Sequence, residues 1–563
     1  MRRIPVIIAL SSLTFLANAQ SQKIQFNGTA RGDIESSWLP KSDTSSLNQK
    51  IKGNALVDLI MDIKPSENIK IKTDLRFSNP MGGFWGQGAA IQLRHISLKG
   101  VASKFFKYRF GDIDLKMTPY TLFNNYGDLS TNESEIFRKT REINEEENYN
   151  FGNYWHQQGA DLAFRLGFDK LIQSADFSGF VVRNRSVTNN VLPDRLHAGG
   201  NAQVNINEKS FIGFNYINLF DLPKTVNDTS VEKFQNSVMT ANFNFDFKKL
   251  YVFGEGGFSN EQFVDKTKIK TIDITGNFFE VGLGKKLLKN DLSIEATFRR
   301  VSDDFYSAGA QTRRLNYATP QVLSLVANNS YTRDAGIFDI VKDASIYNPT
   351  ITPQLMQYSL LFNHVTPYGK ATPNRTGFDL EVAYKDSAER YASNLSTQLL
   401  QDTRGEGTTQ LRNYALINWN GTLAFDKIYS LKKTLSLNAG IQYAKSQRDG
   451  QSLIKDVDLA TQAIDAGAVI ELIPRFDLLL GTKLIFAKGT EYVDVRNDYN
   501  QITGFTQTTI NGTQMLHAVS LRYRFTDNVI FSIQGSTFQY KDKADSEKDY
   551  TINQIYMLFN MKF

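Results

Sequence analysis

The sequence contains no cysteine among its 563 residues. Without a thiol, the chain can form neither a disulfide bond nor a thiolate metal site, and it has no cysteine nucleophile. Histidine is scarce, and the histidines show neither the H-E-x-x-H motif nor the paired spacing of a metal enzyme. They are His95, His156, His197, His364 and His517. We therefore expect no catalytic residues, no bound metal and no cofactor, so the sequence predicts a protein that is not an enzyme.

Long apolar runs are also lacking. Beyond residue 16, no apolar stretch reaches the roughly 18 residues that a membrane-spanning helix requires, and the mean hydropathy is −0.34. The apolar run at residues 4–16 follows Arg2 and Arg3 and precedes a small-residue motif that ends at Ala19. This is the pattern of a secretory signal peptide. We expect residues 1–19 to be removed, so that Gln20 becomes the first residue of a single domain.

Proline is rare and the charge is nearly balanced. The chain has 13 prolines, and its formal net charge of +6 is too small to indicate a nucleic-acid partner. Aromatic residues, by contrast, make up 12% of the sequence, with 40 phenylalanines and 24 tyrosines. This composition favours β-strands and is typical of barrels that place aromatic side chains at membrane interfaces.

Apolar and polar side chains alternate from residue 23 to the end of the chain. Leu292, Ile294 and Phe298 alternate with polar neighbours, and Val519 and Leu521 do so in a later segment. Successive side chains of a strand point to opposite faces, so such segments suit a wall between lipid and a polar lumen. A soluble β-sandwich or propeller also alternates, but it needs no lipid-facing phenylalanines or export signal. We predict an all-β fold, a transmembrane antiparallel β-barrel of about 22 strands within a range of about 18 to 22.

The connections between these segments differ in length. Short polar turns, such as 64–68 and 526–528, mostly alternate with long connections, such as 387–410. In outer-membrane barrels, short turns face the periplasm and long loops face the outside, and we expect the same here. The stretch 365–377 departs from this order, because it is long where a short turn is expected.

The two longest connections cover residues 117–157 and 303–352. Loops of this length without structure of their own tend to be functional. The first carries the run Glu145–Glu147, which fits a solvated face or, alternatively, a constriction loop or cation site inside the barrel. The sequence leaves open whether these two loops close the lumen.

The inward side of the predicted strands carries charges of both signs, including the acidic residues Asp74 and Glu295. A polar lumen tolerates such charges, whereas a charge at the lipid midplane costs about 2–4 kcal/mol. The basic residues expected to line the lumen are Lys70, Lys72, Arg76, Arg109, Arg165, Arg299, Arg522 and Arg524. Two interpretations fit equally well. One is a pore with a mild preference for anions, and the other is a ladder of ion pairs that stiffens the wall.

The end of the chain places Phe559, Met561 and Phe563 on one face of a strand, similar to the last strand of bacterial outer-membrane barrels. That resemblance implies that the strand carries the signal read by the barrel-assembly machinery and seals the barrel against the first strand. Together with the segment Phe110-Gly-Asp-Ile-Asp114, the chain resembles uncharacterised, porin-like outer-membrane barrel proteins of the Bacteroidota. The resemblance implies a location in the bacterial outer membrane, in contact with its lipid.

Two functions compete at this point. The first is a porin-like channel for small polar or anionic solutes or glycans, supported by the charged inner face and the two long loops. The alternative is a non-enzymatic structural or accessory component of an outer-membrane machine, such as a protein-secretion translocon. Its partners would be other outer-membrane or secretion-system proteins, and its support is the lack of a recognisable ligand motif.

Overall fold

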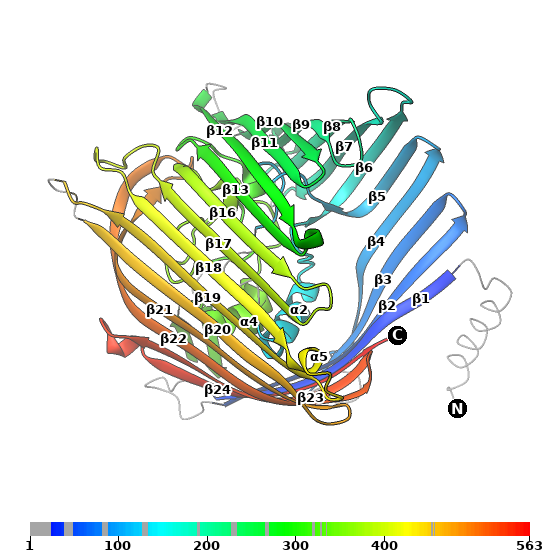
Figure 1. Ribbon diagram of the computed structural model, residues 1–563, viewed down its shortest axis with the longest axis vertical. Helices are drawn as coiled ribbons and strands as arrows, with labels where there is room; N and C mark the ends of the chain where they lie inside the picture. The colour runs from blue at the N-terminus through cyan, green and yellow to red at the C-terminus, as the bar shows by residue number, and fades with distance from the viewer. Residues whose placement is uncertain are drawn as a thin grey trace.

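The computed structural model describes residues 24–563 except for some short stretches. These are 39–48, 82–87, 126–132, 189–191, 227–232, 265–269, 318–320, 327–328, 334, 452–453 and 455. In the described part, 22 strands form one antiparallel sheet in which neighbours in the sequence pair, and the last strand pairs with the first (Figure 1). The sheet is a closed barrel, which confirms the predicted fold class and strand number. The expected signal peptide and its cleavage between Ala19 and Gln20 lie outside the described residues.

The strands of the barrel are between 10 and 25 residues long. The first half of the barrel consists of β1 (Ile24–Trp38), β2 (Gln49–Ser66), β3 (Ile69–Pro80), β4 (Ala90–Ser103), β5 (Phe106–Leu115), β6 (Trp155–Gly167), β7 (Ser174–Arg185), β8 (Asp194–Asn205), β9 (Phe211–Leu222), β10 (Lys233–Phe247) and β11 (Leu250–Val264). The second half consists of β12 (Lys270–Leu287), β13 (Leu292–Val301), β16 (Arg375–Lys385), β17 (Tyr391–Gln401), β18 (Asn413–Ala424), β19 (Leu435–Arg448), β20 (Val457–Ile473), β21 (Phe476–Arg496), β22 (Ile502–Thr526), β23 (Val529–Asp542) and β24 (Tyr550–Lys562). Two further strands, β14 (Gln321–Val326) and β15 (Asn329–Arg333), form a separate hairpin.

Short helices lie in the connections. The α-helices are α2 (Glu135–Glu147), α3 (Ala308–Gln311), α4 (Ile337–Lys342) and α5 (Phe425–Ile428). Single 3₁₀ turns are η1 (Pro223–Thr225), η2 (Leu288–Asn290), η3 (Ala344–Ile346), η4 (Gly369–Ala371) and η5 (Ser546–Lys548). Within the described ranges, every helix is too short or too polar to cross a membrane.

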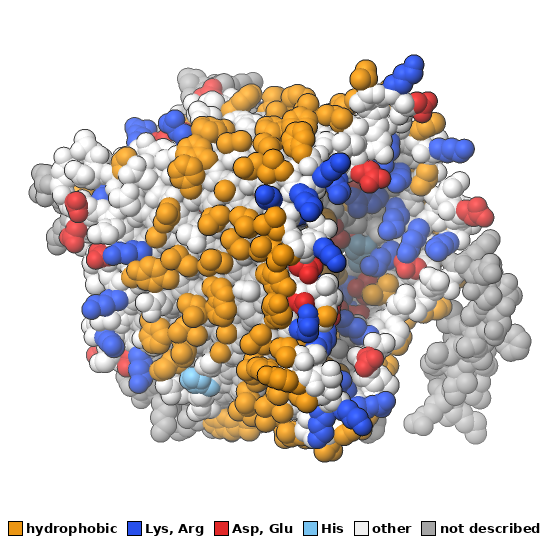
Figure 2. All heavy atoms as spheres, viewed as in Figure 1, with side chains coloured by type: hydrophobic (Ala, Val, Ile, Leu, Met, Phe, Trp, Pro, Cys, Tyr) orange, Lys and Arg blue, Asp and Glu red, His pale blue; other side chains and the backbone are white. Residues whose placement is uncertain are grey.

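The outer wall of the barrel is apolar. In β22, Val519, Leu521 and Tyr523 are exposed, whereas Ser520 between them is buried on the inner side. Leaving a large apolar side chain in water costs about 1.5–3 kcal/mol relative to burying it, so this surface is suited to lipid. Figure 2 shows apolar side chains spread over the outer wall of β16 to β20, with charged side chains at its margins and in the hollow beside β4 and β5.

The barrel closes where β24 pairs with β1 along Thr29–Trp38. At the end of this seam, the Phe563 N–H donates to the Gly28 carbonyl at 3.0 Å, and the Gly28 N–H donates to the Phe563 carbonyl at 2.9 Å. A Cβ on Gly28 would lie 2.5 Å from the Phe563 ring and 2.3 Å from the Asp58 carbonyl oxygen, so only glycine fits. The expected seal between the last and first strands is confirmed, while recognition by the barrel-assembly machinery stays a prediction.

Most connections sort by end of the barrel, as expected, but 425–434 is long at one end and 497–501 is short at the other. Two-residue turns such as 67–68 and 527–528 lie at the end where β1 begins and β24 ends. The connections at the opposite end, the long-loop end, include the two longest, 116–154 and 302–374. We name the described residues of these two connections together the plug, because they fold into the barrel (Figure 1).

Two details of the predicted strand order are wrong. One predicted strand is absent and one strand was missed, so the total number of strands is unchanged. No short turn falls at 365–377, because the chain makes one connection from β13 to β16. Conversely, 387–410 is no long connection, because β17 crosses the wall there. Leu360 and Phe362 are buried inside the barrel, which makes their segment resemble a wall strand. In β17, Ser393 shares the outer face with the exposed Leu395 and Leu399, which weakens the alternation.

The hydrophobic core of the protein lies inside the barrel, between the plug and the wall. Ile136 and Phe137 of α2 and Ile337 of α4 are buried in one cluster with the wall residues Leu516 and Phe538. Helix α2 is amphipathic, so one stripe of apolar side chains meets the wall while charged side chains lie on its other faces. The plug is therefore packed as a folded domain is, and its position in the lumen is defined.

Candidate functional site

The basic residues predicted to line the lumen are paired with acidic residues. Seven of the eight form an ion pair within 4.0 Å, and Lys72 is the exception among the described residues. The pairs are Lys70–Asp62, Arg76–Asp58, Arg109–Asp161, Arg165–Asp176, Arg299–Asp379, Arg522–Asp477 and Arg524–Asp477. Most of these pairs join neighbouring strands, so the arrangement favours the ladder of ion pairs over a free basic ring.

These residues do not form one ring around a pore. The Arg165 side chain is 71% exposed near the short-turn end of β6. The Arg299 side chain is 1% exposed, and Glu280 opposite it accepts a hydrogen bond from Tyr120 of the plug. A buried, paired guanidinium does not contact a passing solute. Arg299 therefore has a structural role and does not line an open conduction path.

The C-terminal end of α2 is held by three arginines of the wall. Arg76 donates two hydrogen bonds of 2.6 Å to Asp58 and a further one of 2.9 Å to Glu147, the last residue of α2. Arg31 also pairs with Glu147, and Arg94 donates to the Glu146 carbonyl at 2.9 Å. Burial alone would raise the pKa of Glu147, but the hydrogen bonds and charges of the arginines outweigh burial and lower it to about 2.

A second set of charges holds the N-terminal end of α2. Glu133 lies 2.8 Å from the Lys483 ammonium and accepts a 2.6 Å hydrogen bond from Arg141. The Ser134 N–H donates to Asp465, which also pairs with Lys483. Burial would raise the pKa of Glu133, but the positive charges of Lys483 and Arg141 outweigh burial and lower it. Both ends of α2 are thus tied to the wall by charged groups.

Glycines in the wall allow α2 to approach it closely. A Cβ on Gly481 would lie 2.3 Å from the Ile136 Cγ2, and a Cβ on Gly467 would lie 2.3 Å from the Ser134 Cβ. Real side chains do not approach this closely, so these two positions admit the plug only because they lack a side chain. Between its charged ends, α2 therefore rests against a recess in β20 and β21.

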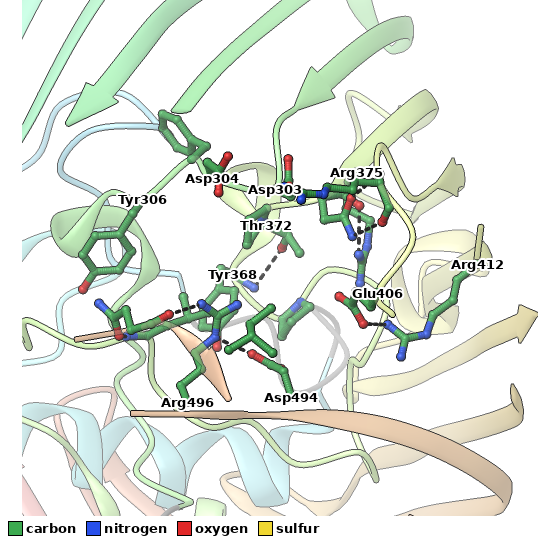
Figure 3. Close-up of a pocket in the computed structure, with 18 of the residues that line it drawn as sticks. Asp303, Asp304, Tyr306, Tyr368, Thr372, Arg375, Glu406, Arg412, Asp494 and Arg496 are labelled. Carbon is green, nitrogen blue, oxygen red and sulfur yellow. Dashed lines mark hydrogen bonds and ion pairs between the residues drawn. The ribbon is translucent and has the colours of Figure 1, made fainter. Parts of the chain in front are cut away.

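A cavity of about 420 Å³ lies between the plug and the wall toward the long-loop end (Figure 3). Its lining is polar and aromatic, and it comes from both parts. The lining includes Asp303, Tyr306, Tyr358 and Tyr368 of the plug, Arg375, Asp494 and Arg496 of the wall strands, and Arg412 of the connection before β18. We name this cavity the mouth pocket.

Charges of both signs face the mouth pocket. Arg412 pairs with Glu406 and lies 3.2 Å from Glu491, and Arg496 pairs with Asp494 (Figure 3). Burial raises the pKa of Tyr368, so its hydroxyl stays neutral, and it donates a hydrogen bond to the Met356 carbonyl. Guanidinium groups, carboxylates and tyrosine rings together are suited to hydroxyl-rich solutes, which need both hydrogen bonds and an apolar face.

Sequence reasoning missed some of the carboxylates that pair with the predicted cations. Asp58 and Asp477 lie at inward positions of their strands, so alternation alone could have assigned them to the lumen. No sequence pattern predicts that Glu133 pairs with Lys483, because the two residues are far apart in the sequence. The run Glu145–Glu147 is not one solvated face: Glu145 pairs with Arg141, while Glu147 is held by the wall.

The sequence matches no family model and no curated protein. Among solved structures, the chain is similar to OccK8 (OprE) of Pseudomonas aeruginosa, with a TM-score of 0.36 and 8% identity over 96% of this chain and 98% of that one. It is similar to a BenF-like porin from Pseudomonas fluorescens Pf-5, with a TM-score of 0.35 and 9% identity over 96% and 99% of the two chains. OpdQ of P. aeruginosa gives a TM-score of 0.33 and 9% identity over 96% and 98%. These values carry no argument about function, and the barrel fold rests on the strand pairing of this chain.

Proposed function

We propose that the chain is a porin-like channel of the bacterial outer membrane that passes small polar or anionic solutes or glycans, with the plug as its gate. The observation that carries the proposal is the mouth pocket. It lies between plug and wall, so a solute that binds there contacts both parts. Its arginines, carboxylates and tyrosines offer hydrogen-bond donors and acceptors to hydroxyl groups. The apolar outer wall supports a location in lipid.

The contacts of α2 suit a gate that is closed at rest. Both of its ends are held by largely buried ion pairs, and separating such a pair leaves an uncompensated charge. Its middle is held by an apolar cluster, and exposing that cluster to water costs free energy. The closed position is therefore favoured until binding energy from a solute offsets part of that cost.

The apolar seal also favours a second candidate function. A lumen that stays closed belongs to a scaffold, and the chain would then be a structural or accessory component of an outer-membrane machine. The buried cluster around Phe137 and Ile337 is the observation that favours this alternative. It predicts a barrel that does not conduct under any condition that leaves the fold intact.

Single-channel recording in a planar bilayer under a salt gradient separates the two functions. We expect the purified wild-type barrel to be closed most of the time, with brief openings. Glu147→Gln removes the charge held by Arg31 and Arg76, so this variant is expected to open more often. Glu146→Gln is the matched control, because only the backbone carbonyl of Glu146 contacts Arg94. A folded wild type and a folded Glu147→Gln that are both silent would favour the accessory function.

A further inference from the structure

Three potential metal ligands meet in the wall of the barrel near its long-loop end. They are His95 on β4, Asp112 on β5 and His156 on β6, and one ligand atom from each lies within 4.8 Å of the other two. Asp112 is buried, and the two histidines are half-buried. The group is separate from the mouth pocket, whose lining contains none of these residues. No sequence spacing predicts it, because three different strands bring the residues together.

The backbone of β5 is shaped to place Asp112. Gly111 has a φ of +96°, and a Cβ there would lie 2.3 Å from the Ile96 carbonyl oxygen, so the position requires glycine. The ladder between β4 and β5 ends at this residue. Beyond that point, the Asp112 side chain replaces the backbone as acceptor: its Oδ2 accepts a 2.6 Å hydrogen bond from the Ile96 N–H. That bond holds one carboxylate oxygen and leaves Oδ1 for another partner.

The free oxygen of Asp112 faces a nitrogen of His156. The distance from Asp112 Oδ1 to His156 Nε2 is 3.6 Å. Two ligands that bind one Zn²⁺ at about 2.0–2.2 Å in tetrahedral geometry lie roughly 3.3–3.5 Å apart. The two atoms thus already have almost the separation that a shared metal ion requires. His95 lies beside them, with its ring centroid 5.6 Å from that of His156.

The other nitrogen of His156 has a carboxylate partner. His156 Nδ1 lies 2.9 Å from Asp114 Oδ1, and a carboxylate can only accept, so Nδ1 carries the proton. In the neutral ring, Nε2 then presents a lone pair toward Asp112. A carboxylate, a histidine and a metal in this order are the usual arrangement at protein metal sites, where the carboxylate fixes the ring and its tautomer. The plug covers the same ring, because Tyr149 stacks on it at 4.4 Å.

We propose that His95, Asp112 and His156 bind a divalent transition-metal ion of the zinc type, with Asp114 orienting His156. Two imidazoles and one carboxylate are a ligand set that such ions favour, and a water molecule completes four-coordination. The bound ion would connect three neighbouring strands of the wall, β4, β5 and β6. It also fixes the ring on which Tyr149 of the plug rests.

The competing explanation is a doubly protonated His156 that pairs with Asp112 and Asp114 without any metal. Calorimetric titration of the EDTA-treated full-length barrel with Zn²⁺ separates the two. We expect one Zn²⁺ per barrel in wild type, and loss of saturable binding in Asp112→Asn and His156→Gln. Asp114→Ala keeps the ligands and loses only the orienting bond, so its affinity falls about 10–100-fold. His517→Gln, on the outer wall, is the control and binds as wild type does.

A second measurement needs no variant and covers the case in which one fails to fold. Zn²⁺ is expected to slow the modification of His95 and His156 by diethyl pyrocarbonate in the wild-type barrel, as read by peptide mass spectrometry. Absence of saturable Zn²⁺ binding in the wild type overturns the proposal. So does equal modification of both histidines with and without Zn²⁺, or unchanged affinity in a folded His156→Gln variant.

Discussion

Arg76 of β3 joins the wall to the plug by donating hydrogen bonds to Asp58 of β2 and to Glu147 of α2 at once. A planar guanidinium can serve two carboxylates in this way, and the wall pair is bidentate. Because Arg76 is buried, its loss leaves two carboxylates without their main partner. The residue therefore connects the structure of the wall to the position of the gate.

Arg76→Gln is expected to loosen α2 while the barrel remains folded. Removing one partner of a buried ion pair costs about 3–5 kcal/mol, because the other charge is left uncompensated. Hydrogen exchange of the α2 amides, followed by mass spectrometry, measures the loosening. Arg109→Gln is the matched control, because its partner Asp161 belongs to the wall. Equal protection of α2 in both variants would show that Arg76 does not hold the plug.

The ion pairs of Glu147 with Arg31 and Arg76 should weaken only at acidic pH. The pKa of this carboxyl is lowered from its ordinary value of 4.5 to about 2, because its arginine partners outweigh burial. A lowered pKa means that the stabilisation is complete above about 4.5 and is lost as the pH falls toward about 2. We expect α2 to stay docked at neutral pH and to be released within that acid window, as read by channel opening. Glu147→Gln should lack this contribution, whereas release near neutral pH in wild type would point to another group.

Alternation predicts the wall of this protein well, because the lipid and the lumen impose opposite demands on successive residues. Val519, Leu521 and Tyr523 show the rule in β22. The rule fails where apolar side chains do not mark the lipid-facing side. In β17, the polar Ser393 lies on the outer face, so the strand was missed. In the plug, Phe362 is apolar but does not face lipid.

The candidate site could not be predicted as the wall could. Its contacts join the plug to strands far away in the sequence, such as Glu133 to Lys483 and Glu147 to Arg31. Such pairs depend on how a loop folds back into the barrel, and no local periodicity encodes that path. A list of inward charges includes Arg299, but only the folded plug shows that its guanidinium is buried.

The seam of the barrel should tolerate no side chain at Gly28. A Cβ there would overlap the Asp58 carbonyl and the Phe563 ring, and the carbonyl cannot move without breaking the ladder between β1 and β2. We expect Gly28→Ala to lower the melting temperature of the purified barrel markedly. Gly32→Ala is the control, because a Cβ there meets no atom within 4 Å. Equal melting temperatures in the two variants would contradict the close packing at the seam.

Two of the predicted lining arginines should behave differently when their charge is reversed. Arg165 is 71% exposed at the short-turn end, so Arg165→Glu is expected to shift the reversal potential of the open channel toward cations. Arg299 is 1% exposed beside Glu280 and Asp379, so Arg299→Glu should destabilise the fold instead. Reversal potentials and melting temperatures of both variants test this contrast. A folded Arg299→Glu with altered selectivity would place Arg299 on the conduction path.

The recess that receives α2 offers the sharpest test of the gate. Gly481→Val introduces atoms where a Cβ alone would lie 2.3 Å from Ile136 and 2.9 Å from Phe137, so α2 cannot occupy its position. The pairing of β21 with its neighbours uses only backbone groups, and the barrel should therefore persist.

We expect Gly481→Val to conduct steadily in a planar bilayer, because expelling α2 removes the apolar seal from the lumen. Gly535→Val is the matched control, since a Cβ at Gly535 meets no atom within 4 Å, and it should gate as wild type does. If Gly481→Val folds, exposes α2 to protease and still does not conduct, α2 is not the gate. The remaining part of the plug, from 302 to 374, would then be sufficient to close the barrel.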